Sequence, residues 1–123
     1  MKEEVILKLV QIQNQFRFLH WQTTADAKHR AYGDIYDTLG DLLDDFAEAC
    51  MGKHGRFEFG EEFSIVFQDI KVLNLQDFVD GITDFLISLN DVFDSNMDSD
   101  LLNLRDEMLL KINKLKYLLT LKY

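Results

Sequence analysis

The sequence predicts an all-α protein, a four-helix bundle formed by a single domain of residues 1–123. Three observations predict this fold class. Four segments repeat apolar residues at spacings of three and four, which is the periodicity of helices with one buried face. Proline is absent from the chain, which suits long uninterrupted helices. Hydrophobic residues make up 47% of the 123 residues, which is ample for a core in a domain of this size.

The four helices are expected at about residues 3–21, 26–51, 75–94 and 99–121. Thr23 and Asp26 are typical of a capping box at the start of the second helix, and Gly52 stands where a glycine would end it. The third segment has the most regular apolar face of the four. The principal apolar positions, in chain order, are Val5, Leu9, Ile12, Phe16 and Leu19; Ile35, Leu39, Leu42, Leu43, Phe46 and Cys50; Phe78, Val79, Ile82, Leu86 and Leu89; and Leu101, Leu104, Met108, Ile112 and Leu115.

The long connection between the second and third helices breaks the helical pattern. A crossover of this length lets the two helices run parallel, as in bundles with one long connection. Its apolar residues alternate with other residues, which is typical of short strands, and a hairpin turning near Gly60 and Glu61 would pair two such strands. The alternating residues are Phe57, Phe59, Phe63, Ile65 and Phe67.

The formal net charge of −9 disfavours nucleic acid as a partner, and direct DNA binding is not expected. From Val72 to Leu104 the sequence contains seven aspartates and no lysine or arginine. A solvated acidic face is the simpler interpretation of this stretch. The alternative is a surface that gathers cations, such as the inner wall of a metal-storing shell.

The sequence indicates a protein of the cytoplasm. It has no apolar run of transmembrane length, so no membrane association is expected. The N-terminal segment lacks the pattern of a signal peptide. The single cysteine, Cys50, cannot form an internal disulfide and lies on an apolar helix face, so it is predicted to be a core residue.

Residues Asp94, Asn96 and Asp98 have the opening spacing of a calcium-binding EF-hand loop. The loop also needs a turn-forming glycine at its sixth position and a bidentate glutamate at its twelfth. Ser99 and Arg105 occupy those positions here. This segment is therefore expected to be a polar link between helices.

The second helix carries the residues that favour a metal site. One flank combines His29 with Asp44 and Glu48, and Gly33 and Gly40 lie on the same flank. Fifteen residues of helix separate His29 from Asp44 by about 22 Å, so one chain cannot bring them to one ion. If two copies of this helix packed antiparallel, His29 of one copy would lie level with Asp44 and Glu48 of the other. The predicted crossing point lies between the two glycines, because glycine allows close approach.

His20 would join this inter-subunit site because the first helix ends beside the start of the second. Asp37 and Asp41 are secondary candidate ligands, although a solvated helix face is the favoured interpretation of these two residues. For His20 alone, a histidine bonded to a backbone carbonyl at the end of the bundle is the commoner case. The paired Glu-x-x-His motif of di-iron bundles is absent from the sequence, which argues against a metal site in the bundle centre.

These residues resemble the Dps mini-ferritins, a ferritin-like family. In that family a His-Trp pair closes the first helix, matching His20 and Trp21, and a second histidine opens the next helix, matching His29. The pair Asp44 and Glu48 matches the family's D-x-x-x-E element. The stretch from Phe18 to Arg56 is also similar to a group of small phage-borne relatives, in the run "LHWQT…H…G…YD.L.DL.D.F.E…GK.GR".

The resemblance implies a ferritin-like fold, a homo-oligomer such as a dodecameric shell, and iron bound between subunits, with Fe(II) oxidation and storage as the activity. Two imidazoles and two carboxylates also suit Zn(II). Three departures from the Dps pattern argue against Fe(II) oxidation. The loop between the histidines is three residues shorter than in Dps, Gly33 stands in place of an aspartate ligand, and the basic N-terminal tail is absent. The alternative function is a structural or interaction protein of a phage, in the host cytoplasm, that keeps the fold without ferroxidase activity.

Overall fold

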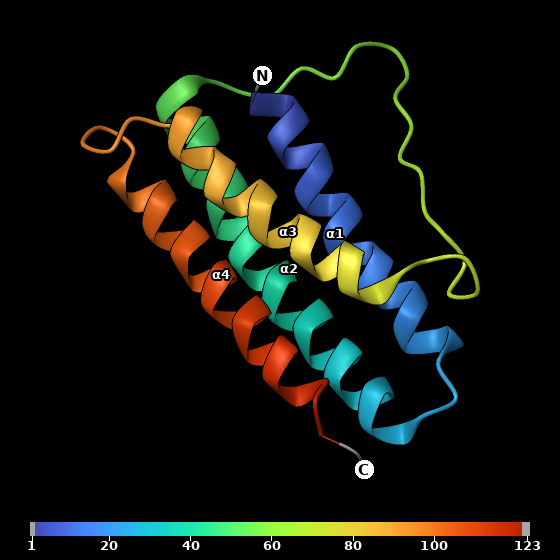
Figure 1. The fold of residues 1–123 in the computed structure, drawn as a ribbon. Helices are drawn as coiled ribbons and strands as arrows, with labels where there is room; N and C mark the ends of the chain where they lie inside the picture. The colour runs from blue at the N-terminus through green and yellow to red at the C-terminus, as the bar shows by residue number, and fades with distance from the viewer. Residues whose placement is uncertain (1, 122–123) are drawn as a thin grey trace.

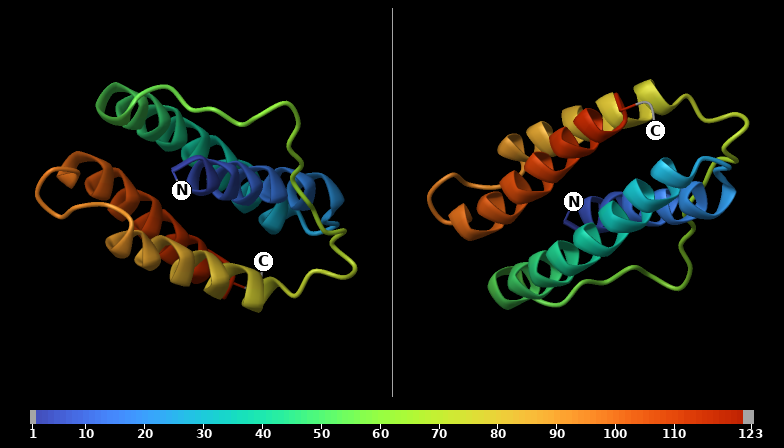
Figure 2. Two further views of the ribbon diagram at one scale, coloured as in Figure 1. Left: turned by 90° about the horizontal axis from the view of Figure 1, so that it is seen from above. Right: turned by 90° about the horizontal axis from the view of Figure 1, so that it is seen from below.

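A computed structural model describes residues 2–121 and confirms the all-α class (Figure 1). Its four helices are α1 (Lys2–Gln22), α2 (Asp26–His54), α3 (Leu75–Ser88) and α4 (Ser99–Leu118), and α3 continues into the short 3-10 helix η1 (Leu89–Asp91). Figure 2 shows two layers, one formed by α1 and α2 and the other by α3 and α4. As predicted from the long crossover, α2 and α3 run parallel, whereas α1 and α2 are antiparallel.

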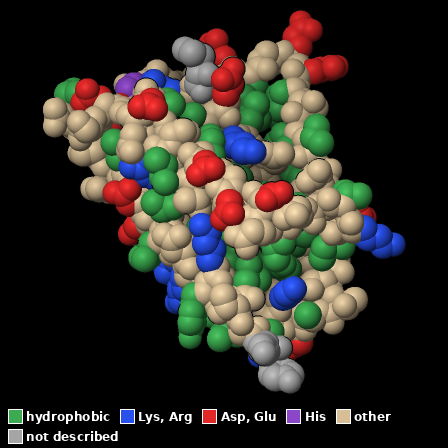
Figure 3. All heavy atoms as spheres, in the orientation of Figure 1, with side chains coloured by type: hydrophobic (Ala, Val, Ile, Leu, Met, Phe, Trp, Pro, Cys, Tyr) green, Lys and Arg blue, Asp and Glu red, His purple; other side chains and the backbone are tan. Residues whose placement is uncertain are grey.

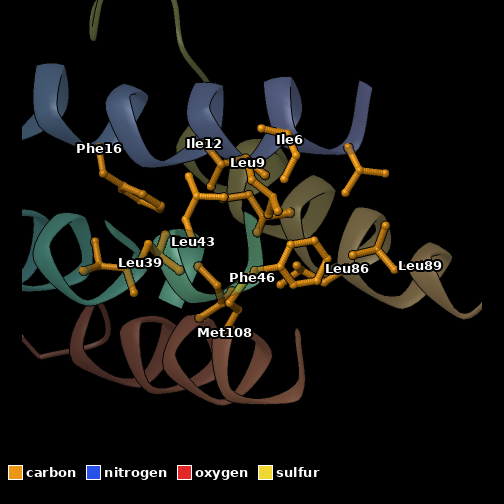
Figure 4. Packing of buried hydrophobic residues seen from close by; sticks show 14 of the residues in the cluster. Ile6, Leu9, Ile12, Phe16, Leu39, Leu43, Phe46, Leu86, Leu89 and Met108 are labelled. Atoms are coloured by element: carbon orange, nitrogen blue, oxygen red, sulfur yellow. The ribbon is translucent and has the colours of Figure 1, made fainter. Parts of the chain in front are cut away.

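The apolar faces of all four helices meet in one core (Figure 4). Phe16 of α1 and Phe46 of α2 are completely buried, and Cys50 is buried with them as predicted. Burial raises the pKa of the Cys50 thiol. The centre of the bundle has a small apolar void whose lining side chains contain no oxygen or nitrogen atom that a metal ion would need as a ligand. These lining residues are Leu9, Ile12, Leu39, Leu43, Ile82, Leu86, Met108 and Ile112.

Both ends of α2 differ from the prediction. The N-cap residue is Ala25, and no side chain caps the helix, so the capping box expected from Thr23 and Asp26 is wrong. The helix also runs past Gly52 to His54 and ends at Gly55, whose φ of +94° is a conformation that favours glycine. Gly52 therefore lies inside the last turn.

The ends of α3 and α4 are also earlier than expected. The α-helical part of α3 stops at Ser88, and near this end Arg105 of α4 donates a hydrogen bond of 2.7 Å to the Leu86 carbonyl. A second bond of 2.7 Å joins Arg105 to the Asn90 side chain in η1. Helix α4 ends at Leu118 rather than 121, and Met1, Lys122 and Tyr123 lie outside the described residues.

The predicted β-hairpin is wrong. Within residues 2–121 there is no strand, and residues 55–74 form an extended crossover strap that runs beside α1 (Figure 1). The alternation in the sequence is nevertheless real, because Phe57 and Phe59 pack partly buried against the core while Glu58 points to solvent. Gly60 has a φ of +80° and the chain bends at Glu61, but no second strand follows within the described residues.

Glutamine side chains of α1 bond to the backbone of the strap, in the place where a second strand was expected to pair with it. Gln15 donates to the Gln68 carbonyl and accepts from the Gln68 amide, both at 2.9 Å. Gln22 accepts from the Ile70 amide at 2.9 Å, and Gln11 binds one further carbonyl of the strap. The strap is therefore held by side chains of α1 that hydrogen-bond to its backbone.

The polar link between α3 and α4 holds that end of the bundle together. Asp98 is almost completely buried, and its carboxylate accepts hydrogen bonds from His54 Nε2 at 2.9 Å and from the Asp94 amide at 3.0 Å. Lys53 forms an ion pair of 2.6 Å with Asp100. The aspartates of the discarded EF-hand pattern thus bind protein groups.

The acidic stretch predicted from the sequence lies on the side of the molecule formed by α3 and α4. Figure 3 views this side and shows acidic side chains scattered between hydrophobic ones. None of the helices within residues 2–121 is long and apolar enough to cross a membrane.

Candidate metal centre

The two predicted histidine ligands form a reciprocal pair at the corner between α1 and α2. Their rings stack with centroids 3.8 Å apart and planes inclined by 15°. His20 Nδ1 lies 2.6 Å from the His29 carbonyl oxygen, and His29 Nδ1 lies 2.8 Å from the His20 carbonyl oxygen. The turn of residues 23–25 brings the end of α1 beside the start of α2, which confirms the prediction that the two histidines meet. We call this arrangement the histidine clamp.

The hydrogen bonds of the clamp determine where each imidazole carries its proton. A carbonyl oxygen can only accept, so Nδ1 must be the protonated nitrogen of both rings. In a neutral ring, Nε2 then carries no proton and has a free lone pair. Within residues 2–121 neither Nε2 takes part in a hydrogen bond or an ion pair. This is the arrangement in which histidine binds metals, because a bond from Nδ1–H to a carbonyl orients the ring and increases its basicity.

Gly33 and Gly40 allow close packing between α1 and α2. A Cβ atom at position 33 would lie 2.9 Å from Cε1 of the His20 ring, and one at position 40 would lie 2.5 Å from Gln13 Nε2. Gly33 therefore has a reason within one chain, where the sequence pattern had suggested a second subunit. At position 40 the close atom is the far end of the flexible Gln13 side chain, which can move aside. Gly33 is also the position at which the family resemblance expects an aspartate, and the His20 ring takes up that space.

Arg17, Trp21 and Tyr36 surround the clamp and were not predicted as part of it. The Arg17 guanidinium lies 4.8 Å from the centre of the Trp21 ring and 5.2 Å from that of Tyr36, and it donates a 3.0 Å bond to the Tyr36 hydroxyl. Trp21 is the single tryptophan of the chain and is 59% exposed. Its position directly after His20 was the available signal in the sequence. Together with Asp34 and Asp37 these groups line a shallow surface pocket over the two rings.

Asp44 and Glu48, the predicted carboxylate ligands, are exposed on α2 and form no ion pair within residues 2–121. Asp37 and Asp41 are exposed as well. In the described part of the chain, no group of three histidine, cysteine, aspartate or glutamate side chains is close enough to hold a metal ion. One chain therefore brings two imidazoles together, and any carboxylate ligand must come from another molecule or from a rearrangement.

The stacking also limits how the rings bind a metal. A metal ion lies in the plane of the imidazole that binds it, about 2.0–2.1 Å from the nitrogen. Two nearly parallel planes stacked at a centroid distance of 3.8 Å do not share such a point. In this conformation His20 and His29 fit two separate ions, or one ion on one ring.

The fold is that of a small four-helix bundle, and two stacked imidazoles lie at one of its corners. The chain belongs to the family described as "Family of unknown function (DUF5856)", whose profile matches residues 20–119. That match begins at His20 and includes the whole of α2, α3 and α4.

A curated relative supports a phage connection. The "Uncharacterized 14.6 kDa protein in mobD-ri intergenic region" of Enterobacteria phage T4 is 37% identical over 54 residues, which are 44% of this chain and 42% of the relative. The match thus spans less than half the length of that protein. No solved structure matches the chain.

Proposed function

We propose that this protein is a Dps-like, ferritin-like oligomer that binds iron or zinc between subunits. His20 and His29 of one subunit supply imidazoles, and Asp44 and Glu48 of a second subunit supply carboxylates. The observation that carries this proposal is the histidine clamp. It fixes both rings through Nδ1 and leaves both Nε2 atoms without a protein partner in the described residues.

The topology and the sequence motif support the same proposal. The bundle has one long crossover and parallel central helices, a connectivity found in ferritin-like folds. The His-Trp, His and Asp-x-x-x-Glu elements resemble those of the Dps family. The buried thiol of Cys50 and the resemblance to a phage protein support a location in the host cytoplasm.

The proposal extends to Fe(II) oxidation and storage, with iron as the substrate rather than a resident cofactor. Imidazole and carboxylate ligands suit both Fe(II) and Zn(II), so the donor set alone does not choose between them. In this proposal the chain's own contribution is to orient the two imidazoles, each of which, in the stacked conformation, offers its Nε2 to a separate ion. Asp37 and Asp41 are secondary ligands, and DNA binding is not part of the proposal because of the negative net charge.

An anaerobic Fe(II) titration followed by exposure to air tests this function. We expect stoichiometric Fe(II) binding, and oxidation faster than in buffer, for the wild-type protein. Both should be lost in the double variant His29→Ala, Asp44→Ala. The matched control is His54→Ala, which removes a histidine whose Nε2 already binds Asp98 and should leave iron binding unchanged. A wild-type protein that neither binds nor oxidises iron would disprove iron binding and Fe(II) oxidation as its function.

A structural or interaction protein is the second candidate function, and one observation favours it. The clamp closes the α1–α2 corner by itself, with two hydrogen bonds and a ring stack. A chain that had lost metal binding would still keep both histidines for this purpose. Unchanged folding stability on adding Fe(II) or Zn(II), together with loss of stability in His29→Ala, would support this second function.

A further inference from the structure

One edge of the crossover strap is held by α1. The Val66 carbonyl accepts a hydrogen bond from Gln11, and the Gln68 amide and carbonyl both bond to Gln15. In an extended chain the backbone N–H and C=O groups of every second residue point to the same side. The backbone groups of the even-numbered residues in this part of the strap therefore face α1.

The opposite edge of the strap has no partner. By the same alternation, the backbone groups of Phe63, Ile65 and Phe67 point away from α1. None of these N–H and C=O groups forms a hydrogen bond within residues 2–121. The strap lies at the outer margin of the molecule, with α1 on its inner side (Figure 1). We call the backbone groups of these three residues the open edge, because unpaired groups in such a row can pair with another extended chain.

The side chains along the open edge alternate in character. Phe67 packs against Phe18 of α1 with ring centroids 5.0 Å apart, and Phe63 packs against Phe59 at the same distance. Phe63 is nevertheless 58% exposed. The even-numbered side chains between them, such as Glu62 and Ser64, are exposed to solvent. An added strand would therefore meet an aromatic row on one face and a polar, acidic row on the other.

The charge of the strap selects the kind of partner. Residues 57–70 contain four acidic residues, Glu58, Glu61, Glu62 and Asp69, and no lysine or arginine. None of these four carboxylates forms an ion pair within residues 2–121. Pairing with the strap of a second copy would double this negative charge along one edge, and like charges on paired strands are destabilising. A segment that carries lysine or arginine is complementary to it.

We propose that the open edge binds an extended, basic segment of another protein, which joins the strap as an added β-strand. Backbone hydrogen bonds to Phe63, Ile65 and Phe67 provide the affinity, and alternating apolar and basic side chains provide the specificity, as in other cases of strand addition. This binding surface is independent of the proposed metal site, because the strap contributes no ligand to that site.

A designed peptide tests the proposal on the whole protein. The probe is a fluorescently labelled nine-residue peptide that alternates lysine and valine, so that one face is basic and the other apolar. We expect saturable binding by fluorescence anisotropy in the presence of a chelator. A peptide with glutamate in place of lysine should not bind. A peptide whose central amides are replaced by esters keeps the side chains but loses the N–H donors, and it should not bind either.

A pair of double variants tests the role of charge. Glu61→Gln with Glu62→Gln removes two exposed charges of the strap and should weaken binding of the basic peptide about fivefold. The matched control is Asp84→Asn with Asp91→Asn, which removes two exposed charges from α3 and η1. This control should bind the peptide as the wild type does.

Amide exchange measured by NMR locates the bound peptide. Binding should slow solvent exchange of the Phe63, Ile65 and Phe67 amides and leave those of Glu62 and Ser64 unchanged. This alternation is the signature of a strand paired at one edge. Absence of binding, equal binding of the acidic or ester peptide, an equal loss of affinity in both double variants, or slowed exchange elsewhere in the chain would each overturn the proposal. Because the assay contains a chelator, none of these outcomes bears on the proposed metal site.

Discussion

The two ends of α2 both use histidine, but in opposite ways. At its start, His29 bonds through Nδ1 to a backbone carbonyl, and His20 does the same in return. At its end, His54 bonds through Nε2 to the Asp98 carboxylate. In the first pair each Nε2 keeps its lone pair, whereas in His54 the corresponding nitrogen is hydrogen-bonded to the Asp98 carboxylate. Whether a histidine in a bundle is a candidate metal ligand therefore depends on which of its ring nitrogens already forms a hydrogen bond within the fold.

The two ends also differ in what limits their packing. The clamp depends on the absence of a side chain at Gly33, whereas the His54 end depends on the charge of a nearly buried aspartate. Shape controls the first end and electrostatics the second. Each of the following predictions tests one side of this comparison.

The largest effect is expected from a pair of glycine substitutions. Gly33→Ala places a Cβ 2.9 Å from the His20 ring, while Gly81→Ala in α3 meets nothing within 4 Å. Both gain the same helix propensity, about 1 kcal/mol. Gly81→Ala should therefore raise the free energy of unfolding. The free energy of unfolding of Gly33→Ala should be lower than that of Gly81→Ala by about 1–3 kcal/mol, because the added methyl group overpacks the contact with His20. Urea unfolding monitored by circular dichroism measures the free energy of unfolding of both variants. Equal stabilisation would show that the His20 ring moves aside at little cost in free energy.

The opposite end should respond to Asp98→Asn. Burial acts to raise the pKa of Asp98, but hydrogen bonds from the Asp94 amide and His54, with the nearby charges of His54 and Lys53, bring it below its ordinary 3.8. Replacing the charge should lower the free energy of unfolding by about 1–2 kcal/mol at neutral pH. Asp91→Asn makes the same change of charge at an exposed position and should have little effect.

The pH dependence of that difference has a definite sign. A carboxylate whose pKa is lowered by folding stabilises the protein above its unfolded pKa, and this stabilisation disappears as the pH falls through the folded pKa. The difference between wild type and Asp98→Asn should therefore shrink below pH 3.8. Urea midpoints measured between pH 3 and 7 check this, and a difference that grows on acidification would contradict the assigned ion pair.

The last prediction concerns the tautomers of the neutral histidine rings and involves no change in stability. The proton should reside on Nδ1 of His20 and His29, because their partners are carbonyl oxygens. In His54 it should reside on Nε2, because the partner is a carboxylate. Long-range proton–nitrogen NMR correlations distinguish the two forms. The Nε2–H form in His20 or His29 would disprove the clamp.

The sequence predicted the helices, their buried faces and the parallel course of α2 and α3. These features depend on local periodicity and on the length of one connection, and both can be read from residues close together in the chain. The alternation of apolar residues in the strap likewise predicted an extended backbone. It did not predict the partner, and the expected hairpin was replaced by contacts with the glutamines of α1.

The site was predictable in part for the same reason. The motif placed His20 and His29 together, and the structure confirms that contact. The ring stack, the tautomers, the intrachain role of Gly33 and the aromatic groups around Arg17 were not predictable. The inter-subunit contribution of Asp44 and Glu48 remains a prediction.

The sequence by itself therefore determined which helix faces are apolar and buried and which segments are helical, because hydrophobic periodicity is a local property of the chain. The tertiary structure decided which partner each polar group has: a carbonyl for His20, a carboxylate for His54 and the strap backbone for Gln15. A polar side chain can bond to many groups with similar energy, and only the packing of distant segments selects one of them.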